Sequence, residues 1–218
     1  MQQEVIDAFH ATATVKRSDI FDDERLTPLT ALIDAQTAAP GWVGRDWAPG
    51  HTVLMAINPG GGGDHYRRNP TDEGLYSLIR AFRDAAVADR GRALQEMSDA
   101  WIQIQSSHNI WKVVDAVLNT TKSDPSRSAF LNILPFRTRQ DKPARSGELR
   151  RAWHRATGKQ VESLAPRRII ALGRKAYDAI ITTGVSAEHE IVMIKRAIGD
   201  SYIPPDARGV LAKLMAES

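Results

Sequence analysis

The segment HTVLMAINPGGGG, residues 51–63, joins an apolar run to a glycine-rich turn. The run 51–57 is mostly aliphatic or β-branched and does not alternate with polar residues, which is typical of a strand covered on both faces of a parallel sheet. Asn58 and Pro59 end the run, and four glycines then bring bare backbone close to whatever lies at the strand end. No Gly-Lys-Ser/Thr follows, and the glycines do not open a helix directly, so neither a Walker loop nor a dinucleotide fingerprint is present. The segment predicts a buried strand ending at a ligand, with a phosphate-binding nest as the generic alternative.

Three further runs share this pattern, namely SAFLNIL (128–134), RRIIALG (167–173) and EIVMIK (190–195). Strands that alternate with helices and long crossovers form right-handed βαβ units. We therefore predict an α/β fold of three layers, α/β/α, with a central four-stranded parallel sheet. In such sheets ligands bind outside the carboxyl ends of the strands, so the loops after these runs should surround one pocket.

Amphipathic patterns and capping residues predict helices between and around the strands, at 27–39, 71–82, 108–118, 148–164, 175–183 and 205–215. No internal repeat, low-complexity tract or convincing linker divides the chain. The prediction is a single domain over residues 1–218, with residues 1–48 as its N-terminal helical part.

The chain has no cysteine, which excludes disulfides, cysteine-held zinc or iron–sulfur groups and thiol nucleophiles. Its six histidines show no pair at metal-ligand spacing, so we expect no metal and no cofactor. The first residues do not resemble a secretory signal, and no stretch is long and apolar enough to span a membrane. We expect a monomeric cytoplasmic protein that makes no membrane contact.

Positive charge is concentrated in one part of the sequence. Residues 137–175 contain twelve lysines and arginines against three acids, a balance of +9, whereas residues 1–60 have a balance of −4. A basic segment in an otherwise balanced chain is what a nucleic-acid backbone partner requires. A solvated helix face is the other interpretation of the same pattern.

Asn132 is an amide near the end of an otherwise apolar strand. A buried amide needs hydrogen-bond partners, so it either satisfies nearby backbone or reads the edge of a ligand. The sequence leaves both interpretations open.

These strand ends resemble the motifs of the uracil-DNA glycosylase superfamily. AINPG (56–60) is similar to its first motif in the mismatch-specific, thymine and single-strand-selective branches, which use Asn-Pro. FLNILPFR (130–137) is similar to the second motif, an apolar strand ending in a base-reading Asn. SLAPRRIIALGRKAYDAI (163–180) is similar to the strand and helix that precede the third motif. The resemblance covers about residues 50–200.

The resemblance implies a DNA glycosylase of base-excision repair, a hydrolase that cleaves the N-glycosidic bond of a flipped uracil- or modified-pyrimidine-type base in single- or double-stranded DNA. It makes Asn58 the residue that positions the attacking water and Asn132 the residue that pairs with the base. Gly60 and Gly61 would contact the base or its phosphates, and Tyr66 would stack on it. Glycine at position 60, where uracil-only relatives place tyrosine, would leave room for a C5 substituent.

A DNA partner also requires phosphate ligands near the pocket. The basic residues expected to bind the DNA backbone are Arg137, Arg139, Lys142, Arg145 and Lys195.

The loop from Lys195 to Tyr202 departs from the family, because it lacks the histidine that donates to a base oxygen in the third motif. Arg196 is the donor we expect in its place, with gripping a phosphate as its alternative role. The missing histidine leaves two other functions open. One is a catalytically silent nucleic-acid binder, and the other is an enzyme acting on free nucleosides or nucleotides.

Overall fold

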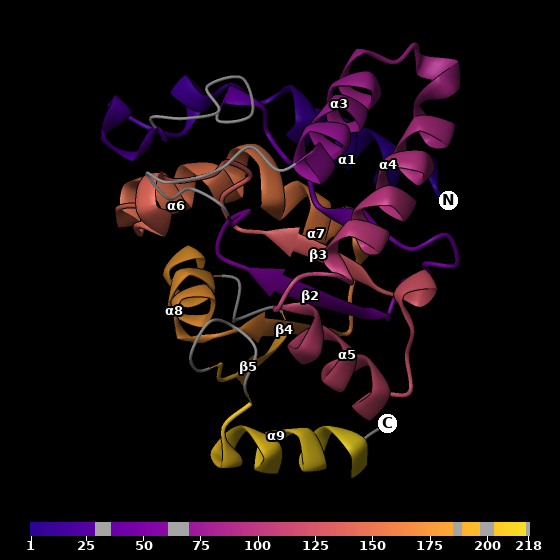
Figure 1. Cartoon of the computed structure of the whole chain (residues 1–218), viewed down its shortest axis with the longest axis vertical. Coiled ribbons are helices and arrows are strands. Elements are labelled where there is room, and N and C mark those ends of the chain that lie inside the picture. The colour runs from indigo at the N-terminus through magenta and orange to yellow at the C-terminus, as the bar shows by residue number, and fades with distance from the viewer. Residues whose placement is uncertain (29–35, 61–69, 185–188, 197–202, 217–218) are drawn as a thin grey trace.

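The computed structural model describes residues 1–28, 36–60, 70–184, 189–196 and 203–216. Its centre is a five-stranded sheet in the order β1-β3-β2-β4-β5 (Figure 1). The strands are β1 (Trp42–Val43), β2 (Thr52–Ala56), β3 (Ala129–Asn132), β4 (Arg168–Leu172) and β5 (Glu190–Ile194). The protein therefore has a mixed α/β fold built on a mostly parallel sheet.

The four strands expected from the sequence all form, and wherever two of these four are neighbours in the sheet they pair in parallel. β2, β3 and β4 are almost wholly buried, as the unalternated apolar runs predict, whereas β5 at the sheet edge is half-buried. The coarse prediction of an α/β fold is confirmed.

The count of four strands is corrected by β1, which pairs antiparallel with β3. Its two residues are too few to show a strand period, and they lie in the turn-rich segment 39–50. Gly41 makes the pairing possible, because a Cβ at this position would lie 2.1 Å from the carbonyl oxygen of Phe130. β1 also lies inside residues 1–48, so this N-terminal part is not purely helical.

The α-helices are α1 (Gln3–Thr14), α3 (Pro70–Asp84), α4 (Arg90–Gln105), α5 (Trp111–Thr120), α6 (Ser146–Ala152), α7 (Gly158–Leu164), α8 (Arg174–Thr183) and α9 (Pro205–Ala216). The shorter turns are the 3₁₀ segments Arg17–Asp19, Glu24–Leu26, Val87–Asp89, Pro125–Arg127 and Arg139–Asp141, and the π turn Trp153–Thr157. In Figure 1, α1, α3 and α4 lie toward the β3 side of the sheet, and α9 lies beyond β5. The helix expected at 27–39 falls largely outside the described residues.

One hydrophobic core joins the two ends of the chain. Val5 of α1 and Leu214 of α9 belong to the same buried cluster as the central strands. The interpretation of residues 1–218 as one domain stays a prediction. Among the helices that the structure describes, none is both long and apolar enough to cross a lipid bilayer.

Candidate functional site

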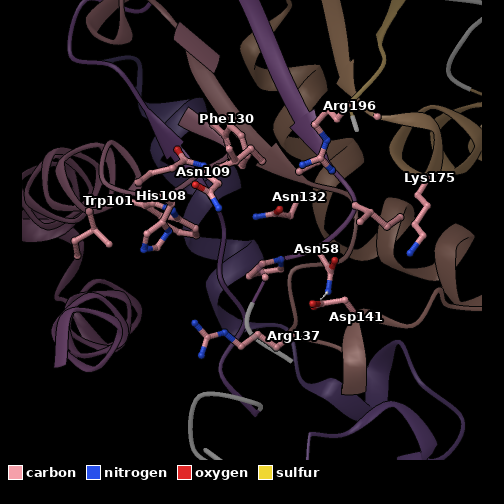
Figure 2. Close-up of a pocket in the computed structure, with 18 of the residues that line it drawn as sticks. Asn58, Trp101, His108, Asn109, Phe130, Asn132, Arg137, Asp141, Lys175 and Arg196 are labelled. Atoms are coloured by element: carbon pink, nitrogen blue, oxygen red, sulfur yellow. Dashed lines mark hydrogen bonds between the residues drawn. The ribbon is translucent and has the colours of Figure 1, made fainter. Parts of the chain in front are cut away.

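A cavity of about 650 Å³ opens at the carboxyl ends of the parallel strands, where the fold class predicts a ligand site. Figure 2 shows how side chains from separate segments meet there. The walls of the cavity include residues from the loops after β2 and β3, the β4–α8 corner, and the turn between α4 and α5, together with Arg196 after β5. The cavity is therefore built from segments far apart in the sequence.

The sheet register explains why the two predicted asparagines face the same cavity. Ala56 of β2 pairs with Asn132 of β3, and the pairing continues through the hydrogen bond from Ile133 N to Ala56 O at 3.0 Å. Asn58 lies two residues beyond Ala56, in the bend that follows β2, close to the strand end that carries Asn132. Both asparagines line the cavity (Figure 2).

Asn132 is only 3% exposed, and its side chain extends into the cavity. Its Nδ2 is buried and has no hydrogen-bond partner among the described residues. Leaving such a donor unsatisfied costs about 1–3 kcal/mol, so native proteins rarely keep one without a use. Such a donor, facing a cavity, favours the interpretation in which Asn132 recognises the edge of a ligand over the one in which it satisfies nearby backbone.

The backbone of Asn132 is fixed from behind by Thr157. The Thr157 hydroxyl donates to the carbonyl oxygens of Asn132 at 2.8 Å and Ile133 at 3.1 Å. Thr157 is buried and ends the π turn that links α6 to α7. Single π turns of this kind recur at functional sites, and here the turn orients a hydroxyl toward the strand end that carries the unpaired amide.

Asn58 is held by two neighbours from the loop after β3. Its Nδ2 donates to Thr138 Oγ1 at 3.0 Å and lies 3.5 Å from Asp141 Oδ1. With the amide nitrogen engaged in this way, the Oδ1 of Asn58 is left to accept a hydrogen bond. This is the orientation that positioning a water molecule requires.

Arg137 lies in the cavity wall and not on an open loop. It is 4% exposed, and its guanidinium carbon lies 4.7 Å from the centre of the Tyr76 ring. The sequence favoured a DNA-backbone contact for this residue, but its burial restricts it to groups that enter the cavity. Figure 2 shows it on the same side of Asn132 as Asn58.

The other residues predicted to bind the backbone do not line this cavity. Arg139 is half-buried, and Lys142 and Arg145 are exposed on the following loop. Arg145 lies 3.6 Å from Asp23, and Lys195 forms an ion pair with Asp206. The predicted backbone ligands are thus spread along the loop after β3 and the end of β5, and Lys195 is tied to α9.

Two of the predicted base contacts, Gly61 and Tyr66, lie outside the described residues. Gly60 lines the cavity, and no atom of the described residues lies within 4 Å of the position that its Cβ would occupy.

Arg196 enters the cavity wall across the β4–α8 corner. Gly173 there has φ 96° and ψ 163°, a conformation that only glycine adopts readily. A Cβ at Gly173 would lie 2.9 Å from Nε of Arg196, so the guanidinium packs against the bare backbone. The absence of a side chain at Gly173 thus leaves room for Arg196.

We expect Gly173→Ala to destabilise the fold by about 2–4 kcal/mol, since it adds backbone strain and pushes on Arg196. Gly184→Ala is the matched control, because Gly184 has φ 85° and no atom of the described residues lies within 4 Å of its Cβ position. Its cost should be about 1–2 kcal/mol, from the backbone alone. Urea denaturation of both variants measures the difference, and equal losses would mean that the Arg196 contact carries no strain.

Among the lining residues that the sequence did not predict are three from one region of the chain. Trp101 near the end of α4 and His108 and Asn109 in the following turn form a wall opposite Arg196 and Lys175, with Asn132 between them (Figure 2). They precede a helix and do not follow a strand, so the rule of strand ends could not find them. The sequence signal available for His108 and Asn109 was that these two polar residues stand directly before the apolar pattern of α5.

The charge of the cavity wall is mainly positive. Arg137, Arg174, Lys175 and Arg196 line it, and Asp141 is the one acid among the described lining residues. Such a wall suits a ligand that carries or develops negative charge. Within the described part of the chain, no cluster of three or more His, Cys, Asp or Glu side chains could hold a metal ion.

Comparison with protein-family models gives no match for this chain, and no curated protein matches it at a significant level. The functional conclusion therefore depends on the residues of the cavity and their chemistry.

Proposed function

We propose that this protein is a DNA glycosylase-like hydrolase that cleaves the N-glycosidic bond of a flipped uracil- or modified-pyrimidine-type base. The proposal includes the three-layer arrangement of the uracil-DNA glycosylase superfamily around the parallel part of the sheet. Its substrate would be DNA, and its residues would act without a cofactor.

The observation that carries the proposal is the buried Nδ2 donor of Asn132, which has no hydrogen-bond partner among the described residues and lies in a cavity that Asn58 also lines. A pyrimidine edge offers carbonyl oxygens that would accept from this donor. A cavity of about 650 Å³ lies within the usual range for small-molecule sites and is large enough for one nucleoside.

The remaining groups suit the charge changes of the reaction. Cleavage builds positive charge on the sugar while negative charge leaves on the base. Arg196 lies across the cavity from His108 and could stabilise the departing base from one side. Asn58 would orient the water, because an amide accepts a hydrogen bond but is too weak a base to take its proton.

Specificity for the pyrimidine C5 position would depend on Gly60. Among the described residues, no side chain lies beside this glycine where a methyl group or a larger substituent would meet it. We therefore include 5-modified pyrimidines and thymine among the expected substrates.

An enzyme acting on free nucleotides is the second candidate, and the burial of Arg137 favours it. A guanidinium that is 4% exposed inside the cavity reaches a phosphate only if that phosphate enters with the nucleoside. A free nucleotide brings its phosphate into the cavity as it binds, whereas a phosphate of DNA meets this condition only when its nucleotide is flipped.

The decisive experiment is a panel of end-labelled oligonucleotides, single- and double-stranded, that carry uracil, hypoxanthine, xanthine, T·G or 5-modified pyrimidines. We expect at least one pyrimidine lesion to be converted to an alkali-labile abasic site. The same lesions are supplied as free nucleosides and 5′-monophosphates, with base release followed by chromatography.

Release from the free monophosphates alone would replace the glycosylase with the nucleotide enzyme. Binding of oligonucleotides without base release from any substrate would mean a silent binder. A protein that neither binds nor cleaves would contradict both proposals.

A further inference from the structure

Asp141 places a carboxylate beside Asn58, the residue expected to orient the attacking water. Its Oδ1 lies 3.5 Å from Asn58 Nδ2, and the side chain lines the cavity (Figure 2). It is the one acid among the described residues of the lining. Asn58 is neutral and cannot remove a proton from water, so the base must be another side chain of the cavity. Figure 2 shows the lining histidine, His108, on the wall with Trp101 and Asn109, whereas Asp141 lies beside Asn58.

The backbone of this loop holds Asp141 in an unusual conformation. Gln140 and Asp141 have φ of 54° and 51°, both in the left-handed region that residues other than glycine rarely adopt. The turn is closed by hydrogen bonds from Asp141 N to Thr138 O at 3.0 Å and from Lys142 N to Arg139 O at 3.1 Å. Thr138 also accepts from Asn58, so one buried residue positions both the amide and the carboxylate.

We infer that Asp141 is the general base that activates the attacking water, a role that rests on the proposed glycosidic hydrolysis. Asn58 Oδ1 accepts one O–H of the water, and Asp141 accepts the proton that is removed. The water oxygen bonds to C1′ of the sugar as the C1′–N bond breaks, and the electron pair of that bond leaves on the base. The proton on Asp141 passes to the departing base or to solvent, and the second water proton stays on the new C1′ hydroxyl.

A purely structural Asp141 would serve only as an acceptor that orients Asn58. Asp141→Asn separates the two roles, because its amide oxygen still accepts from Asn58 but cannot take a proton at neutral pH. Asp141→Ala removes both roles and leaves space beside the sugar. Azide, a nucleophile with no proton to lose, can then replace the water.

The test uses single-turnover cleavage of an end-labelled oligonucleotide that carries one 2′-deoxyuridine, or the panel lesion that the full-length protein cuts fastest. We expect Asp141→Asn to slow base release by about 10²–10³-fold with little change in affinity. Added azide should restore much of the rate of Asp141→Ala and leave a C1′-azido sugar, which mass spectrometry detects. Asp89→Asn, an exposed acid paired with Arg92 at 2.9 Å, is the control and should keep the wild-type rate.

Each result has one meaning. A wild-type rate in Asp141→Asn, or an Asp141→Ala that azide does not rescue, would overturn the role of Asp141 while the glycosylase function stands. A wild-type protein that cleaves no panel substrate would overturn the function and the inference together.

Discussion

Asn58→Ala is expected to slow base release by about 10³-fold while changing oligonucleotide affinity by roughly threefold or less. The side chain would act on the water and not on the base, so its loss should appear in the cleavage step. Its removal also leaves Thr138 and Asp141 without the amide that joins them. Single-turnover cleavage and fluorescence anisotropy measure the two effects separately.

Asn119→Ala is the matched control for this variant. Asn119 is an exposed asparagine on α5 that donates to Asp115 at 3.0 Å, and it does not line the cavity. Its removal should change neither rate nor affinity. If Asn58→Ala weakened binding as much as it slowed cleavage, the residue would hold the substrate in place and not orient water.

The meeting of Asn58 and Asn132 could be predicted from the sequence, because Asn58 follows one unalternated apolar run and Asn132 lies near the end of another. Such runs form buried parallel strands, and parallel strands end at the same edge of a sheet. In the sheet, Ala56 at the end of β2 pairs with Asn132 at the end of β3, which brings the two strand ends side by side. The position of Gly60 at the cavity wall follows from the same reasoning.

The loop residues could not be placed in this way. Asp141 depends on two left-handed residues, which neither Gln140 nor Asp141 signals as a glycine would. Arg137 looks like an exposed cation in the sequence, but stacking on Tyr76 and a position beside a buried strand end enclose it. Periodicity describes regular elements and says nothing of the path of a loop.

Two regular elements were also missed, for different reasons. β1 is too short to show a pattern in the sequence, and its pairing with β3 is seen only in the structure. α4 does carry apolar residues at helical spacing, with Leu94, Met97 and Trp101 all buried. This spacing would have allowed the helix to be predicted, and Trp101 near its end lines the cavity.

The largest effect on stability is expected at Arg17, a cation that is only 5% exposed. Its guanidinium donates to Thr27 Oγ1 at 3.0 Å, to Arg137 O at 2.9 Å and to Leu26 O at 2.7 Å. It also lies 4.4 Å from the centre of the Phe21 ring. Arg17 thus ties the N-terminal part of the chain to the backbone of the loop that carries Arg137, Thr138 and Asp141.

Arg17→Met keeps much of the side-chain volume but leaves three buried acceptors without their donor, so we expect it to lower the free energy of unfolding by about 3–5 kcal/mol. Burial lowers the pKa of Arg17 to about 10, against the opposing charges of Glu148 and Glu24. The folded protein therefore keeps this proton below that pH, as the unfolded chain does, and the loss of stability should be constant from about pH 5 to pH 9.

Urea denaturation followed by tryptophan fluorescence measures the loss of stability, with Arg45→Met as the control. Arg45 is 62% exposed and paired with Asp99, so its loss should cost at most about 1 kcal/mol. Equal losses in the two variants would mean that the contacts of Arg17 do not hold the site loop in place.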